Sequence, residues 1–314
     1  MIALTDPLPG ESRMTSPTSS SQHHTSPALI QGHAVERLAA FACGETGGNP
    51  AGVVLCDSLP DAATMQAIAA EVGYSETVFA APESGAAGHA AWRVRYFAPE
   101  IEIPFCGHAT IALGAALAAR YGENVYALQI NAARISVEAS REEGHLVIAL
   151  QSPPTRSEPA PAELLQAALA LFGYEAADLD PRLPPAVAEG GARHLILALA
   201  DRRRLADMHY DQEQGRILMQ AHGFATMALV HAQTPTFFDA RNPFAAGGVY
   251  EDPATGAAAA ALAGYLRDIG WPHAGAIDIL QGEDMGMPSR LRAEITPQAG
   301  ASIRISGTVR ALDA

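Results

Sequence analysis

The fold is decided by two similar apolar stretches, CGHATIALGAALAARYG at residues 106–122 and ATGAAAAALAGYLRDIG at residues 254–270. They align with Gly107 on Gly256 and Leu113 on Leu262, an offset of 149 residues. Alanine and glycine occur all round each predicted helix, so neither helix has a face suited to water. We therefore expect each helix at the centre of its own half of the molecule, enclosed by a strongly curved sheet.

A second pair of matching segments lies upstream of each helix. MQAIAAEVGYSETV at residues 65–78 matches LMQAHGFATMALV at residues 218–230, with Gly73 on Gly223. An internal repeat of this kind indicates two halves of the same construction. Strand-like runs such as AGVVLC, ETVFAA and AWRVRYF alternate with helical stretches. The sequence predicts an α+β fold of two pseudo-symmetric lobes, each a curved, mostly antiparallel sheet around a central apolar helix.

The 314 residues are divided by these repeats into two lobes of the usual domain size. Residues 1–32 are rich in Ser, Thr and Pro without hydrophobic periodicity, and we predict a disordered tail there. Residues 33–150 are expected to form the first lobe. Residues 151–314 are expected to form the second lobe, with the last strand free to return to the first.

Composition excludes several classes of function. The net charge of −14 disfavours a nucleic-acid partner, and all 20 basic residues are arginines. Without lysine the chain has no amine for a Schiff base, for pyridoxal phosphate or for a Walker motif. Three cysteines without a CxxC pair favour a reduced, cytoplasmic setting and indicate no metal site. No apolar run is long enough to cross a membrane, so we expect no membrane partner. We also expect no cofactor.

The starts of the two central helices predict an anion site. If the lobes face each other, the unpaired N–H groups and positive dipole ends at Gly107 and Gly256 converge on one cleft. A small anionic substrate carrying a carboxylate fits such a cleft. The alternative is that these small residues only let the helices enter the core.

Glu76 is the candidate acid or base, because the repeat places Thr226 at the matching position and so leaves one carboxyl group in the pair. Apolar neighbours favour burial and a raised pKa, which suits a group that takes and returns a proton. A surface glutamate on a turn is the alternative. His108, at the helix start, is either a neutral hydrogen-bond donor or a structural histidine. Asp252 before Pro253 is, on spacing alone, a helix cap.

Four ordered motifs together resemble the PhzF-like family of phenazine-biosynthesis isomerases, which shares the fold of diaminopimelate epimerase. They are GNPAG at 48–52, SET at 75–77, FCGHAT at 105–110 and EDPATG at 251–256, and Gln281-Gly282 and Gly286-Met287-Pro288-Ser289 also look like family positions. The resemblance implies a homodimeric isomerase that moves a hydrogen on a cyclohexadiene substrate without metal or coenzyme. It assigns the acid/base role to Glu76 and substrate positioning to His108 and Asp252. It places substrate contacts at Asn49, Ser75, Gly107, Gly256 and Ala257.

Two departures from related patterns keep other functions open. Ala257 stands where the family usually has a serine that contacts substrate, so a non-catalytic small-molecule binding or interaction protein is one alternative. The sister epimerases and proline racemases use two opposed cysteines. Cys106 occupies the first position, but Pro253 occupies the second and cannot transfer a proton, which disfavours the alternative of a cofactor-independent racemase or epimerase.

Overall fold

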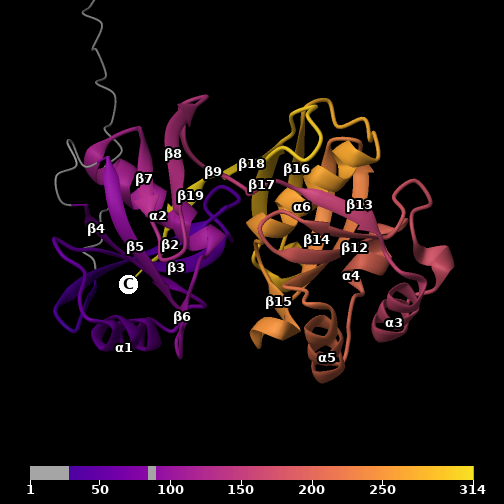
Figure 1. Cartoon of the computed structure of the whole chain (residues 1–314), viewed down its shortest axis with the longest axis horizontal. Coiled ribbons are helices and arrows are strands. Elements are labelled where there is room, and N and C mark those ends of the chain that lie inside the picture. The colour runs from indigo at the N-terminus through magenta and orange to yellow at the C-terminus, as the bar shows by residue number, and fades with distance from the viewer. Residues whose placement is uncertain (1–27, 84–89, 314) are drawn as a thin grey trace, which may run out of the picture.

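The computed structural model describes residues 28–83 and 90–313 and shows two lobes side by side, the N-terminal half in indigo to magenta and the C-terminal half in orange to yellow (Figure 1). The first lobe contains β1 (Ala28–Ile30), β2 (His33–Ala40), β3 (Asn49–Leu55), α1 (Ala62–Val72), β4 (Thr77–Pro82), β5 (Ala91–Phe97), β6 (Glu102–Ile103), α2 (Gly107–Tyr121), β7 (Asn124–Gln129), β8 (Arg134–Glu142) and β9 (His145–Gln151).

The second lobe follows the same plan with additional helices. It contains β10 (Arg156–Pro159), α3 (Ala162–Phe172), β11 (Ala186–Glu189), β12 (Arg193–Ala198), α4 (Arg202–Ala206), α5 (Gln212–His222), β13 (Thr226–Thr234), β14 (Phe237–Pro243), β15 (Glu251–Asp252), α6 (Gly256–Asp268), β16 (Ala276–Gln281), β17 (Ser289–Glu294) and β18 (Arg304–Gly307), and the chain ends with β19 (Val309–Ala311).

The strand pairings repeat from lobe to lobe. In the first lobe β3 and β4 are parallel, β5 and β7 are parallel, and β2–β3, β4–β5, β7–β8 and β8–β9 are antiparallel. In the second lobe β12 and β13, then β14 and β16, are the parallel pairs, within the same antiparallel frame. The result is one large mixed sheet in which antiparallel pairings predominate among the described residues.

Two exchanges of strands join the lobes. β9 of the first lobe pairs antiparallel with β18 of the second, with Leu150 opposite Ile305. The chain then returns, and β19 pairs antiparallel with β2, with Val309 opposite Ala40. β9 and β19 thus each pair with a strand of the other lobe. Backbone hydrogen bonds as well as side chains therefore fix the two lobes relative to each other.

The helices α2 and α6 lie at the two centres. α2 is buried continuously from His108 to Leu117 and packs on β2, β3, β8 and β9, while α6 is buried from Ala258 to Leu266 and packs on β10, β11 and β17. Small residues permit the close approach. A Cβ added to Gly114 would lie 2.7 Å from methyl groups of both Val137 and Ile148. Together α2 and α6 lie in a single continuous apolar core.

In α1 the residues Met65, Ile68, Ala69 and Val72 recur at the three- and four-residue spacing that predicts one buried helix face, and the structure confirms this face. Gly73 ends the helix in the left-handed conformation with φ of 72°. The helix packs behind β4 and β5, which fixes where the chain emerges at residues 74–76. The position of the loop that carries Glu76 is therefore set by an ordinary amphipathic helix.

The N-terminal boundary of the first lobe lies earlier than the sequence predicted. Residues 28–30 were expected in a tail that ends at residue 32, yet they form β1 and pair with β2, with Ala28 opposite Val35. The physical reason is Ile30, which is buried with Met65 and Ile68 against α1. Residues 1–27 lie outside the described part of the chain. In the described part, no helix is long and apolar enough to cross a membrane.

Candidate active site

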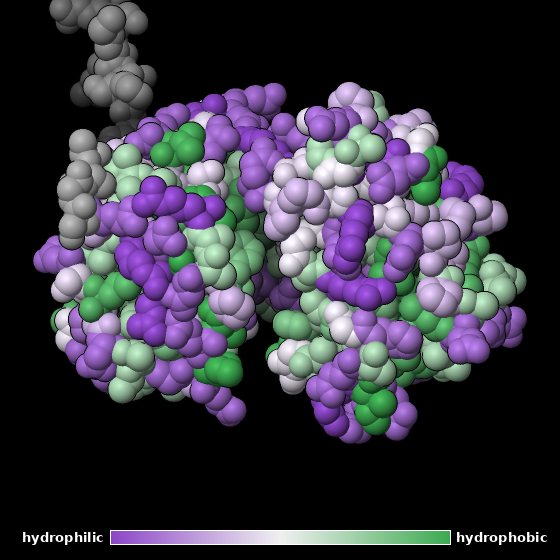
Figure 2. Space-filling view, viewed as in Figure 1, coloured by the Kyte–Doolittle hydropathy of each residue, from purple (hydrophilic) through white to green (hydrophobic). Residues whose placement is uncertain are grey.

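The sequence motifs of the first lobe and those of the second lobe meet at the opening between the lobes. The space-filling view shows the surface hollowed between the lobes (Figure 2), and β6 and β15, which precede α2 and α6, flank this opening (Figure 1). The two central helices contact each other across the seam. A hydrogen bond also crosses it, because Asn49 Nδ2 of the first lobe donates to Asp252 Oδ1 of the second at 2.8 Å.

Glu76 and His108 meet on the first-lobe side of the seam. Glu76 Oε2 lies 3.3 Å from His108 Nε2, and the two side chains are 15% and 8% exposed. The contact is close, but it is not aligned as a hydrogen bond, and Glu76 Oε2 is a buried oxygen without a hydrogen-bond partner. A buried carboxylate oxygen left unpaired costs stability. Its persistence in a cleft marks it as available to a ligand.

Asp252 is held by a network on the second-lobe side. Asn49 donates to Oδ1, and Thr255 Oγ1 donates to Oδ2 at 2.5 Å. Gln281 supports the turn from behind, since its amide donates to the Asp252 carbonyl at 2.7 Å and to Thr255 Oγ1 at 3.0 Å. The carboxyl group is therefore fixed in orientation, and both Gln281 and Thr255 act as positioning residues.

The network corrects one expectation from spacing. Asp252 and Pro253 were predicted to be the cap and first residue of a helix, but α6 begins at Gly256. The intervening Pro253 and Ala254 instead form a turn packed against Gly282, where a Cβ would lie 2.8 Å from the Pro253 carbonyl oxygen. Asp252 accepts the Thr255 hydroxyl rather than a helix N–H. Its carboxyl group is thus turned toward Asn49 of the first lobe, at the seam.

Neither central helix has a side-chain cap. Cys106 precedes α2 and Thr255 precedes α6, and in both cases the cap residue makes no side-chain hydrogen bond to the helix. A Cβ added to Gly107 would meet no atom within 4 Å, so open space lies beside this helix start. An uncapped helix start beside open space leaves backbone N–H groups unpaired, which is the arrangement that an anion site requires.

Burial and like charge raise the pKa of two groups in the cleft. Burial, with a smaller contribution from the Glu76 charge, raises the pKa of Asp252, although His108 and the Thr255 hydrogen bond oppose this. Burial first, and then the charge of Glu76, holds the pKa of the Cys106 thiol well above its ordinary value. Cys106 is therefore a neutral thiol, with its sulfur 3.3 Å from His108 Nδ1.

Comparison with known proteins identifies the family. Residues 38–312 match a model of the PhzC-PhzF family of phenazine biosynthesis-like proteins, which spans nearly all of the described chain. The chain belongs to the PhzC-PhzF family. It is an isomerase of that family, and the relatives and solved structures that it resembles agree with this assignment.

Two curated relatives illustrate the match. An uncharacterized isomerase of Mesorhizobium japonicum is 33% identical over 85% of this chain and 92% of its own length. The trans-2,3-dihydro-3-hydroxyanthranilate isomerase of Pseudomonas aeruginosa is 34% identical over 85% of this chain and 93% of its own length. Among solved structures, a PhzF-family protein of Bacillus anthracis has a TM-score of 0.77 at 24% identity, with 89% and 96% of the two chains covered. A hydroxyproline epimerase of Agrobacterium vitis, at 14% identity and a TM-score of 0.55 over 89% and 90% of the chains, shares the fold.

The predicted site residues of this PhzC-PhzF isomerase do not all lie together. Glu76 and His108 are in contact, Asn49 and Asp252 are in contact, and the charges of Glu76 and His108 both act on Asp252. Gly107, Gly256 and Ala257 form the two helix starts. Ser75 is exposed on the loop before Glu76, and no hydrogen bond ties it to the other residues.

Sequence reasoning assigned no role to Thr255, and it discussed Cys106 only as a racemase-type cysteine that lacks its partner. Gln281 appeared as a family position without a role. Thr255 and Gln281 lie next to recognised motif residues, but their contacts with Asp252 depend on how β16 runs beside the turn. Cys106 and His108 are two residues apart at the start of α2, a spacing at which helical side chains do not normally face each other, so no local pattern predicted their contact.

The second lobe shows what replaces the carboxyl group at the matching position. Thr226 donates from Oγ1 to Asn242 Oδ1 at 3.0 Å and contacts His194 Nδ1 at 2.8 Å, and all three residues are buried. Burial lowers the pKa of His194 to about 4, so this histidine is neutral. The second copy is therefore a closed, uncharged polar cluster, and the asymmetry leaves Glu76 as the acidic member of the pair.

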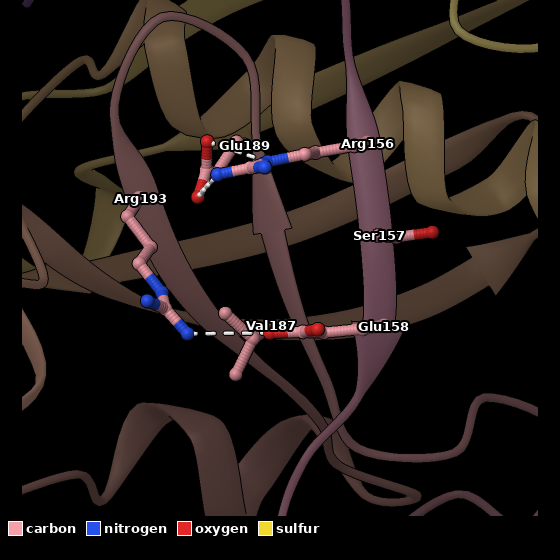
Figure 3. Close-up of a pocket in the computed structure, with 6 residues that line it drawn as sticks. All are labelled: Arg156, Ser157, Glu158, Val187, Glu189 and Arg193. Carbon is pink, nitrogen blue, oxygen red and sulfur yellow. Dashed lines mark hydrogen bonds and ion pairs between the residues drawn. The ribbon is translucent and has the colours of Figure 1, made fainter.

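The close-up in Figure 3 shows a different hollow, on the outer strands β10, β11 and β12. Arg156 makes two hydrogen bonds to Glu189, and Arg193 pairs with Glu158. Both arginines are already neutralised, and Ser157 points away from the hollow (Figure 3). Because both arginines pair with glutamates, this hollow is a weaker candidate for an anion site than the cleft.

Proposed function

We propose that this protein is a cofactor-independent isomerase that moves a proton on a small substrate bearing a carboxylate, with Glu76 as the general acid and base. One observation carries the proposal: the buried, unpartnered Oε2 of Glu76 lies beside His108 at the start of α2. A base needs a free lone pair directed at the proton it removes, and this oxygen has one.

The substrate carboxylate is expected at the two helix starts. N–H groups near Gly107 and Gly256 would bind its oxygens, and the open space beside Gly107 leaves room for them. The chain has a net charge of −14, so the cleft attracts an anion through these local donors and not through its overall field. Binding of the anion holds the adjacent carbon within reach of Glu76.

The reaction is an allylic proton shift. Glu76 takes a proton from a carbon next to a double bond. The electrons of that C–H bond form a new double bond, and the electron pair of the existing double bond moves to its far carbon. The proton on Glu76 exchanges with water, and Glu76 then gives a proton to that far carbon, so atoms and charge balance without an oxidant or reductant. His108 and Asp252 would position the substrate and stabilise the charge that develops on it.

The class of substrate comes from a relative. The isomerase of Pseudomonas aeruginosa acts, by its name, on trans-2,3-dihydro-3-hydroxyanthranilate, a ring with a carboxylate and two double bonds. We propose a related cyclic unsaturated acid for this enzyme. Ala257 provides no hydroxyl at the start of α6, so a substrate that needs a hydrogen bond there would bind less tightly.

Replacing Glu76 by Gln tests the mechanism. The amide keeps the size of the side chain but cannot take a proton, so turnover should fall by a factor of about 100 or more, the usual contribution of general base catalysis. With wild-type enzyme in deuterium oxide, NMR should show deuterium entering the product at one carbon. Activity within about tenfold of wild type would remove Glu76 from the mechanism.

The same experiment separates the alternatives. A non-catalytic binding protein would bind the acid equally well with or without Glu76 and would show no deuterium exchange. A two-base racemase would need a second proton donor opposite Cys106, where the chain has Pro253. Inversion of a stereocentre that is lost on alkylation of Cys106 would favour the racemase.

We also propose a homodimer, to be measured by light scattering, and a reducing cytoplasmic setting. The free state of Cys43, Cys56 and Cys106 supports the second point.

A further inference from the structure

Cys106, His108 and Glu76 bring a thiol, an imidazole and a carboxylate together at one point of the cleft. One donor atom from each lies within 4.8 Å of the others, and among the described residues this is the group with such an arrangement of metal-binding donors. The proton shift described above uses Glu76 and places His108 next to it, but it gives no role to the thiol. The cluster therefore calls for its own explanation.

Two of the distances are close to the edges of a zinc tetrahedron. With bonds of about 2.3 Å to sulfur and about 2.0–2.1 Å to nitrogen and oxygen, the ligand atoms stand about 3.3 Å (N to O) and about 3.6 Å (S to N) apart. Glu76 Oε2 lies 3.3 Å from His108 Nε2, and Cys106 Sγ lies 3.9 Å from the same nitrogen. Because Sγ lies nearer to Nδ1, at 3.3 Å, the imidazole ring must turn toward the sulfur for one ion to bind all three atoms.

The chemistry of the donors favours a thiophilic divalent ion. Thiolate and imidazole together select zinc and its neighbours over magnesium or calcium, which prefer oxygen ligands alone. Glu76 Oε2 has no hydrogen bond to give up. The negative charges of Glu76 and Asp252 both act on the sulfur, so they favour a cation bound to it.

We infer that Cys106, His108 and Glu76 form a binding site for Zn²⁺ that inhibits the enzyme by engaging its catalytic carboxylate. When the ion binds, the Cys106 thiol loses its proton to water. The Cys106 sulfur, His108 Nε2 and Glu76 Oε2 then each donate an electron pair to the ion. The fourth position stays open to water or to the carboxylate of a substrate. An enzyme with zinc bound has no free base and does not turn over.

The inhibitory effect of zinc rests on the proposed function, whereas the metal site does not. The site itself is tested without any substrate, by titration of purified full-length protein with Co²⁺ as a spectroscopic stand-in for zinc. A cobalt–thiolate bond gives a sulfur-to-metal charge-transfer band in the near ultraviolet. We expect that band in wild-type protein and expect added Zn²⁺ to remove it by displacement.

Three cysteine variants locate the sulfur. Cys106→Ala should lose the band and weaken zinc binding by at least about 10- to 100-fold. Loss of a residue that only hydrogen-bonds to a metal ligand already has an effect of that size. Cys43→Ala and Cys56→Ala are the matched controls, because both residues are free cysteines outside the cluster and should leave band and affinity unchanged. Glu76→Gln should weaken zinc binding while the band survives.

The outcomes distinguish the two proposals. If wild-type protein shows no charge-transfer band, or if the band persists in Cys106→Ala, the zinc site is wrong whatever the enzyme does. If the band behaves as expected but metal-free Glu76→Gln still turns over, the zinc site stands and the proposed mechanism fails. With both correct, Zn²⁺ abolishes turnover of wild-type enzyme, and a chelator restores it. Stimulation of turnover by zinc would overturn the inhibitory role.

Discussion

The carboxyl group of Asp252 is buried at the seam between the lobes, and its burial affects the stability of the fold. Asn49 and Thr255 donate hydrogen bonds to its carboxyl group, yet burial dominates and raises the pKa of this acid. An acid whose pKa is raised on folding contributes its full stability below its ordinary pKa and loses it as pH rises through the raised value. At neutral pH the buried negative charge therefore destabilises the fold.

Replacing Asp252 by Asn should consequently preserve or raise stability at pH 7 while impairing turnover. Asn keeps an oxygen that can accept from Asn49 and removes the buried charge. Urea unfolding of both proteins at pH 7 and pH 4 measures the effect. The advantage of the variant should shrink at pH 4, where the wild-type acid takes up a proton. A variant that is less stable at pH 7 by more than about 1 kcal/mol would show that hydrogen bonds to the carboxylate outweigh the cost of its burial.

At the scale of elements, α2 contains two glycines with opposite surroundings. A Cβ at Gly107 meets nothing within 4 Å, whereas a Cβ at Gly114 would lie 2.7 Å from Val137 and Ile148 on the enclosing strands. The first glycine keeps space for a ligand, and the second lets the sheet close on the helix. Both belong to one helix, which makes them a matched pair for mutation.

Gly107→Ala should fold normally and bind substrate poorly, whereas Gly114→Ala should do the reverse. We expect the first to raise KM about tenfold, equivalent to about 1.4 kcal/mol of binding energy, with unchanged Tm. Overpacking at Gly114 should cost about 1–3 kcal/mol, reduced by up to about 1 kcal/mol of better helix propensity. Steady-state kinetics and thermal unfolding measure both. Equal effects of the two substitutions on KM would contradict a ligand space beside Gly107.

The elements themselves could be predicted from the sequence because their signals are local. Apolar composition placed 106–122 and 254–270 at the centres of two lobes, and the spacing of Met65, Ile68 and Val72 defined the face of α1. β1 was missed because three residues carry too little periodicity, and it is the contact of Ile30 with α1 that fixes it. Asp252 was read as a cap because Asp-Pro is a local signal, whereas its partners come from Asn49 and β16.

The site as a whole is a property of the two lobes together. The repeat predicted that a lone carboxyl group would face paired helix starts, but distances across the seam depend on the exchange of β9 and β19 between lobes. No single-lobe signal encodes the bond from Asn49 to Asp252, which joins residues 203 positions apart. The geometry of the cleft thus depends on both sheets, because each contains a strand that pairs with the other lobe.

Asn49 offers a test of this coupling. Its Nδ2 donates to Asp252 Oδ1 at 2.8 Å and to the Ala254 carbonyl at 3.2 Å, and the side chain is 2% exposed. Asn49→Ala would leave two acceptors of the second lobe without a donor, at a cost of about 1–3 kcal/mol. It would also release Asp252, so kcat/KM should fall at least tenfold, or about 1.4 kcal/mol.

Gln233→Ala is the matched control for Asn49→Ala. The Gln233 amide also donates to a buried carboxylate, Asp239, at 2.9 Å, but both residues belong to the second lobe. The control should lose a similar amount of stability in urea and keep its kcat/KM. Asn49→Asp should be worse than Asn49→Ala in both measurements, because it sets a second carboxyl group against Asp252. If Asn49→Ala and Gln233→Ala had the same small effect on kcat/KM, the bond across the seam would only hold the lobes together and would not position Asp252 for the reaction.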